Sequence, residues 1–179
     1  MQLEHPLLKW IGHRASLLDL GCGKGEMLQQ LHQHLQIRGF GADIDTDCLR
    51  FCLSQGLSVV HQNLNEPMTV FADNSFDLVL AKDVLHYTHH PEKVLAEMLR
   101  IGNRAIIGFN NYGWWKRRIK FMVSGSHQAS HQQTDSVWYQ EQMFKPFSIN
   151  DFVELCRNNN HQIIDFSFIE TASPLGYVA

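Results

Sequence analysis

The sequence predicts an α/β fold, a doubly wound and mostly parallel sheet with helices on both faces. Two observations favour it: strand-like and helix-like segments alternate along the 179 residues, and a glycine-rich loop follows the first strand. Leu17–Leu20 is an apolar run typical of a buried parallel strand, and glycines at 21, 23 and 25 follow it. Strand, loop and helix together indicate the first half of a nucleotide-binding βαβ unit.

Each predicted helix has an apolar face or a recognisable end. The first has apolar residues at helical spacing, from Met27 to Leu35. Thr46 is the expected N-cap of the second helix, which ends at Gly56. The other end signals are Pro91 and Gly102 for a third helix and Ser148 with Asp151 for a late one.

Short apolar segments predict the other strands, at residues 39–45, 57–60, 75–81, 103–109 and 161–170. Only residues 171–179 remain after them, so we expect the last strand to be a stub, either because the natural chain is short or because it is trimmed. In such a sheet the ligand binds at the carboxyl ends of the strands, where the loops after Leu20, Ala42 and Ala81 converge.

The glycine spacing indicates which nucleotide the loop binds. A dinucleotide fingerprint, G-x-G-x-x-G, requires glycine at position 26, where this chain has Glu26. The second predicted strand also ends in an acid, Asp43, placed beside the loop. A carboxylate there can accept hydrogen bonds from both hydroxyls of a ribose. We therefore expect a nucleoside cofactor, with a nicotinamide dinucleotide as a distant alternative.

The segment from Asp19 to Gly25 resembles the first motif of the class I S-adenosylmethionine-dependent methyltransferases. The resemblance implies that this loop lies near the methionine half of the cofactor, that Asp43 holds the ribose and that Ile44 packs on the adenine. The family often has an acid after the third strand, where this chain has Asn63, whose amide keeps an acceptor without the charge. The full set of expected cofactor-binding residues is Asp19, Gly21, Cys22, Gly23, Gly25, Asp43, Ile44, Asn63, Leu64 and Ala81.

Two further segments, Val94–Gly125 and Pro146–Cys156, resemble the MetW-like branch of that superfamily, which belongs to methionine biosynthesis. The chain departs from the branch at Asn110, where proline is usual, and at residues 140–147, which read QEQMFKPF. The branch is associated with homoserine O-acyltransferase. The resemblance thus implies two functions, methyl transfer to a small molecule or, alternatively, activation of the acyltransferase.

Composition favours one domain over residues 1–179. Its 44% hydrophobic content supports a sizeable core, and a net charge of −3 gives no general field for nucleic acid. We find no signal peptide and no apolar run of about 20 residues, which predicts a cytoplasmic protein without membrane contact. The four cysteines form no C-x-x-C pair, and Cys22 is a small residue that fits the glycine turn.

His86 is the best candidate for a catalytic base, because it follows the fourth strand, where the methyl acceptor would bind. An ordinary histidine beside the cofactor is the competing and favoured interpretation. Tyr87 and Tyr112 are interpreted in the same way. The histidine pairs 86/90 and 127/131 have helical spacing, but neither contains the Glu of an H-E-x-x-H motif. Pro91 directly follows the first pair and the second lies in a polar stretch, so we expect no metal site.

The segment Trp114–Val123 predicts a helix with apolar residues on one side and basic residues largely on the other. Packing of its apolar side onto the core is the simplest interpretation. A partner surface is the alternative, since tryptophan and arginine are favoured at interfaces. One basic turn on an acidic protein makes nucleic acid improbable as the partner.

Overall fold

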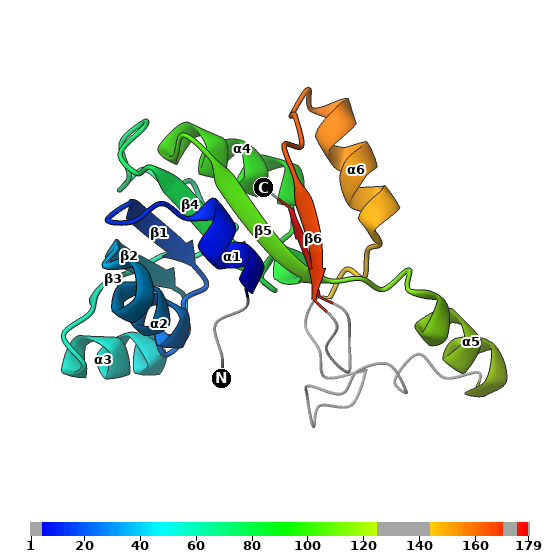
Figure 1. Ribbon diagram of the computed structural model, residues 1–179, viewed down its shortest axis with the longest axis horizontal. Helices are drawn as coiled ribbons and strands as arrows, with labels where there is room; N and C mark the ends of the chain where they lie inside the picture. Colours follow the sequence, from blue (N-terminus) through cyan, green and yellow to red (C-terminus); the bar gives the residue numbers. More distant parts are fainter. Residues whose placement is uncertain (1–4, 125–143, 170–174, 179) are drawn as a thin grey trace.

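The computed structural model describes residues 5–124, 144–169 and 175–178, which form an α/β domain around one sheet (Figure 1). The strand order is β3-β2-β1-β4-β5-β7-β6. The first five strands of that order pair in parallel, and β7 pairs antiparallel with β5 and β6. The bounds are β1 Ser16–Leu20, β2 Arg38–Asp43, β3 Ser58–His61, β4 Leu78–Lys82, β5 Ala105–Asn110, β6 Phe166–Ile169 and β7 Leu175–Val178.

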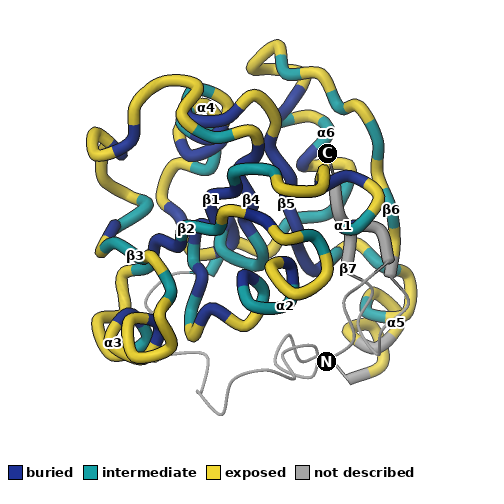
Figure 2. The backbone as a smooth tube through the Cα atoms, turned by 60° about the vertical axis from the view of Figure 1, so that its left-hand side comes forward, coloured by how far each residue is buried: buried dark blue, intermediate teal, exposed yellow. Residues whose placement is uncertain are grey.

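Helices cover both faces of the sheet, as the alternating pattern predicts. One buried cluster joins the sheet to α1, α2 and α3, and a second joins it to α4 and α6. Figure 2 shows the buried residues concentrated on the central strands between these layers. The helices are α1 His5–Trp10, α2 Glu26–Leu35, α3 Thr46–Ser54, the 3-10 turn η1 Leu85–Tyr87, α4 Pro91–Ile101, α5 Trp115–Ser124 and α6 Ile149–Asn158.

The apolar run of β1 is explained by burial on both faces. Leu17 belongs to the cluster with α1 and α2, whereas Leu18 and Leu20 belong to the cluster with α4 and α6. Successive side chains of a strand point to opposite faces, so a strand between two helical layers needs apolar residues at nearly every position. Asp19 is the one polar side chain in this buried stretch, on the face of Leu17.

The structure corrects three predicted element ends. Asp45, not Thr46, caps α3, because its carboxylate accepts from the amides of Asp47 and Cys48. Strand β6 begins at Phe166 rather than at residue 161. The last strand is also not the expected stub, because residues 175–178 form a strand, β7, that lies between β5 and β6 in the sheet. The predicted capping box of α6, Ser148 with Asp151, is confirmed.

Helix α5 does not pack its apolar side onto the core, so that interpretation is wrong. In Figure 1 the helix lies apart from the sheet, beyond the end of β5. The side chains expected in the core, Trp115, Ile119, Met122 and Val123, are between 50% and 83% exposed. The helix therefore needs another explanation for its apolar stripe.

Candidate functional site

The glycine loop is fastened to the end of β2 by main-chain and carboxylate hydrogen bonds. The amides of Gly21 and Cys22 donate to the Ala42 carbonyl at 2.7 and 3.2 Å. The Gly23 amide donates to Asp43 Oδ2 at 2.7 Å, and the Asp45 amide donates to Asp43 Oδ1 at 2.9 Å. Asp43 thus links the loop to the start of α3 and keeps lone pairs on both oxygens for further donors.

The three loop glycines have left-handed backbone conformations, with φ of +75°, +52° and +74° at Gly21, Gly23 and Gly25. A Cβ atom at Gly21 would collide with Val84, and one at Gly25 would collide with Leu57. A Cβ at Gly23 would meet nothing within 4 Å. Gly21 and Gly25 are therefore required by packing, whereas Gly23 lies on the open side of the loop, where a ligand can approach the backbone.

Asp19 is a buried carboxylate beneath this loop. Burial, reinforced by the nearby charge of Asp43, raises the pKa of Asp19 to about 7, and Lys82 opposes the rise. No donor among the described residues hydrogen-bonds to its carboxylate. A cation bound here would favour the charged form of Asp19, so the site is electrostatically suited to a positively charged ligand.

The other predicted cofactor residues lie in different environments. Ile44 follows Asp43 and is 58% exposed, so its side chain is available to pack on a ring. The Asn63 amide closes its own turn, accepting from the Asn65 amide at 3.0 Å and donating to Glu66 at 3.1 Å. Leu64 packs against the core, and Ala81 is fully buried there, so only main-chain atoms of Ala81 can reach a ligand.

Two thiols support the loop from inside the protein. The sulfur atoms of Cys22 and Cys52 lie 3.8 and 3.2 Å from the Gly23 carbonyl oxygen. Burial raises the pKa of both thiols, so they stay protonated at neutral pH. Their contribution is packing and weak hydrogen bonding rather than nucleophilic chemistry, which agrees with the interpretation of Cys22 as a residue that fits the turn.

The loop after β4 contains a polar pair that the sequence analysis missed. Asp83 has φ +58° and donates its amide to the Gly108 carbonyl at 2.7 Å. Its carboxylate accepts from the buried Asn110 side chain at 3.0 Å. An acid two residues after a predicted strand was a usable signal, but its pairing with Asn110 on β5 is tertiary and has no local signature.

His86 lies in an aromatic cluster rather than on an open surface. Its ring centroid is 4.3 Å from that of Phe147, 5.1 Å from Phe144 and 5.2 Å from Tyr112. Its Nδ1 is 2.9 Å from the Lys145 carbonyl oxygen, which can only accept, so Nδ1 carries the proton. The structure brings His86 and Tyr112 together and buries the imidazole, while Tyr87 is half exposed. The assignment of a base stays a prediction.

The described residues contain no group of three side chains able to hold a metal, and none of their helices is long and apolar enough to cross a membrane. His127 and His131 lie outside the described residues.

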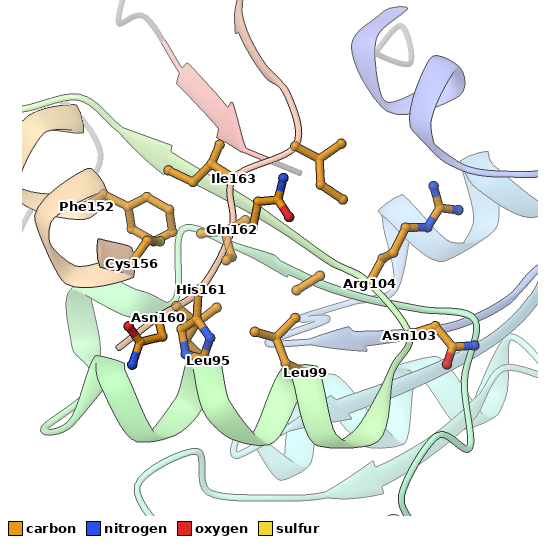
Figure 3. A pocket seen from close by; sticks show the side chains of 13 residues that line it. Leu95, Leu99, Asn103, Arg104, Phe152, Cys156, Asn160, His161, Gln162 and Ile163 are labelled. Carbon is orange, nitrogen blue, oxygen red and sulfur yellow. The ribbon is translucent and has the colours of Figure 1, made fainter. Parts of the chain in front are cut away.

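Figure 3 shows a cavity of about 270 Å³, and none of its lining residues belongs to the glycine loop. It is lined by side chains of α4 and α6 and by residues at the start of β5, including Leu95, Phe152 and Arg104. The glycine loop, in contrast, follows the carboxyl end of β1, so this cavity lies at the opposite edge of the sheet. It does not contribute to the site built around Asp43.

The loop glycines predict distinct effects on stability. Gly21→Ala and Gly25→Ala should each destabilise the protein more than Gly56→Ala, because only the first two add a collision to the unfavourable positive φ. Gly56 has φ +75° and open space around its missing Cβ, which makes it the matched control. We expect about 1 kcal/mol for Gly56→Ala and at least about 2 kcal/mol for the others in urea unfolding. Equal losses in all three variants would contradict the packing role.

The raised pKa of Asp19 predicts a pH-dependent stability. Between about pH 4 and pH 7 the folded protein holds a proton on Asp19 that the unfolded chain has released. The free energy of unfolding should therefore fall with rising pH in this window, by up to about 1.4 kcal/mol per pH unit from this group. Asp19→Asn should remove that component when the two proteins are unfolded in urea at several pH values. Parallel profiles would contradict the assignment.

Comparisons with known proteins agree with this fold. The structure superposes on an S-adenosylmethionine-dependent methyltransferase from Methanosarcina mazei with a TM-score of 0.74 at 16% identity, covering 99% of this chain and 96% of that one. The sequence is 31% identical over 81 residues to the human mitochondrial arginine-hydroxylase NDUFAF5, which is 45% of this chain and 24% of that protein.

A more extensive match is to the bifunctional methionine biosynthesis protein MetXA/MetW of Rhodopirellula baltica. It is 28% identical over 144 residues, which cover 76% of this chain and 23% of that longer protein. The model of the family described as methionine biosynthesis protein MetW matches residues 4–176. The chain therefore belongs to the MetW family.

Proposed function

We propose that this chain binds S-adenosylmethionine in the site formed by the glycine loop and Asp43. The observation that carries the proposal is the position of Asp43, whose two oxygens fix Gly23 and Asp45 and retain acceptor capacity. Gly23 leaves the loop open on one side, and exposed Ile44 adjoins it. In this arrangement Asp43 accepts from the ribose hydroxyls, Ile44 packs on the adenine and the loop backbone lies along the methionine half.

Charge supports this choice of ligand. S-adenosylmethionine carries a sulfonium and an ammonium group, and Asp19 and Asp43 form an acidic pair near the loop that Lys82 only partly balances. A cationic ligand relieves the repulsion between the two carboxylates, whereas the pyrophosphate of a dinucleotide would add to it. The Asp43 charge, which adds to the effect of burial in raising the pKa of Asp19, thus also favours a positively charged cofactor.

We propose methyl transfer to a small molecule as the activity of the site. The bound cofactor would supply an electrophilic methyl group. The protein would contribute mainly by orienting the acceptor, because this displacement requires a base only when the nucleophile is protonated. His86, with its proton on Nδ1, would accept a proton through Nε2 if the aromatic cluster opened to an acceptor.

A second function, association with a homoserine O-acyltransferase, is favoured by a separate observation. The Rhodopirellula relative is a bifunctional MetXA/MetW protein, so the MetW part is covalently joined to a MetXA part there. Joining two partners in one chain raises their effective concentration, which benefits proteins that act together. We propose that the present chain binds its acyltransferase as a separate protein, and this function is compatible with cofactor binding.

Replacement of Asp43 tests the cofactor site. Asp43→Ala should weaken binding of S-adenosylhomocysteine by at least about tenfold in calorimetry, because a charged hydrogen bond contributes about 1.5–3 kcal/mol. Asp47→Ala is the matched control, since this nearby acid is exposed and pairs with Arg50. Asp43→Ala also removes the hydrogen bond that holds Gly23, so a loss of affinity could come from the loop rather than from the ribose. The ligand must therefore be varied as well.

A ligand lacking both ribose hydroxyls separates the two roles of Asp43. If the carboxylate binds the ribose, the dideoxy analogue of S-adenosylhomocysteine should bind weakly to the natural protein and lose much less affinity in Asp43→Ala than the parent ligand does. Equal losses for both ligands would show that Asp43 only holds the loop.

A further inference from the structure

The apolar face of α5 points away from the rest of the domain. Trp115, Ile119, Met122 and Val123 recur at helical spacing and are all at least half exposed. We call these four residues the α5 stripe. Over positions 115 to 123 they span about 12 Å along the helix axis. A continuous exposed stripe of this kind marks an interaction site rather than a scattered set of surface residues.

On the opposite side of the helix, the side chain of Arg117 contacts the domain. The Arg117 guanidinium lies 4.4 Å from the centre of the Tyr112 ring, and Tyr112 in turn packs against His86 and Phe144. Arg117 therefore faces the domain, while the α5 stripe lies on the opposite side of the helix. An orientation held by Arg117 keeps the stripe presented to solvent.

Positive charge flanks the stripe. Lys116 and Arg118 are exposed, and within the described part of the chain neither forms an ion pair with a carboxylate. The sequence of α5 contains no acidic residue, although the whole chain has a net charge of −3. An apolar stripe edged by unbalanced cations fits a groove that is apolar at its floor and acidic at its rim.

We propose that α5 is the helix by which this chain docks onto its homoserine O-acyltransferase, in an apolar groove of that enzyme rimmed by carboxylates. The inference rests on the association proposed above and specifies the surface of this chain that contacts the enzyme. Two observations favour an enzyme over a lipid surface as the occupant. The joined MetXA/MetW relative supplies a protein partner for this domain, and Arg117, which a lipid-bound helix would direct at headgroups, is turned inward onto Tyr112.

The test measures binding between the purified full-length chain and purified acyltransferase from the same organism by calorimetry. The double variant Ile119→Glu with Met122→Glu should lose at least 100-fold in affinity, because it places charge in the apolar groove beside an acidic rim. Leu53→Glu is the matched control, since Leu53 is 60% exposed on α3 and should leave the affinity unchanged. Arg118→Glu should weaken binding, and more so at low salt.

The possible outcomes test separately whether the two proteins associate and whether α5 is the surface of contact. If the double variant binds the enzyme as well as the natural chain does, the association stands and the α5 surface is wrong. If the natural chain fails to bind the enzyme, the association fails and the docking inference falls with it. Vesicles of phosphatidylcholine and phosphatidylserine serve as the competing surface. The proposal would be overturned in favour of a membrane if the natural chain sedimented with these vesicles, the double variant did not, and the natural chain did not bind the enzyme.

Discussion

The Asp43 carboxylate is the interaction on which the candidate site depends. It accepts the Gly23 amide at 2.7 Å and the Asp45 amide at 2.9 Å, so it joins the glycine loop to the turn that starts α3. The same turn is closed by Asp45, whose carboxylate caps the helix. Without Asp43 the loop would lose the contact that fixes Gly23, and only the main-chain hydrogen bonds from Gly21 and Cys22 to Ala42 would join it to the end of β2. The residues that we assign to cofactor binding at this edge would then no longer be held in fixed positions relative to one another.

A short series of contacts connects this loop to the exposed helix. Gly21 must stay free of a side chain because Val84 fills that space, and His86 follows Val84 by two residues. The His86 ring packs on Tyr112, and Tyr112 stacks with Arg117 of α5. The glycine loop thus packs against Val84, two residues before the aromatic cluster that holds the proposed docking helix.

Local patterns in the sequence predicted most of the fold, because the signals for a strand, a glycine loop and a helix start are short-range. The strands β1 to β5 along the chain and the roles of Pro91 and Ser148 follow from such signals. The aromatic cluster around His86 does not, since it forms with Tyr112, 26 positions later in the chain, and with Phe144 and Phe147, about 60 positions later. For α5 the sequence left packing on the core and a partner surface as alternatives, because amphipathic spacing shows that a helix has an apolar face but not which surface covers it.

Chemical shifts of the backbone amides test the central claim most directly. In a titration of the ¹⁵N-labelled protein with S-adenosylhomocysteine, the largest changes should occur at Gly21, Gly23, Ile44 and Asp45, the amides of the loop and of the turn after β2. Addition of NAD at the same concentration should leave these amides nearly unchanged. Changes centred instead on the cavity between α4 and α6, or none at saturating ligand, would contradict the assignment of a cofactor site to Asp43 and the glycine loop.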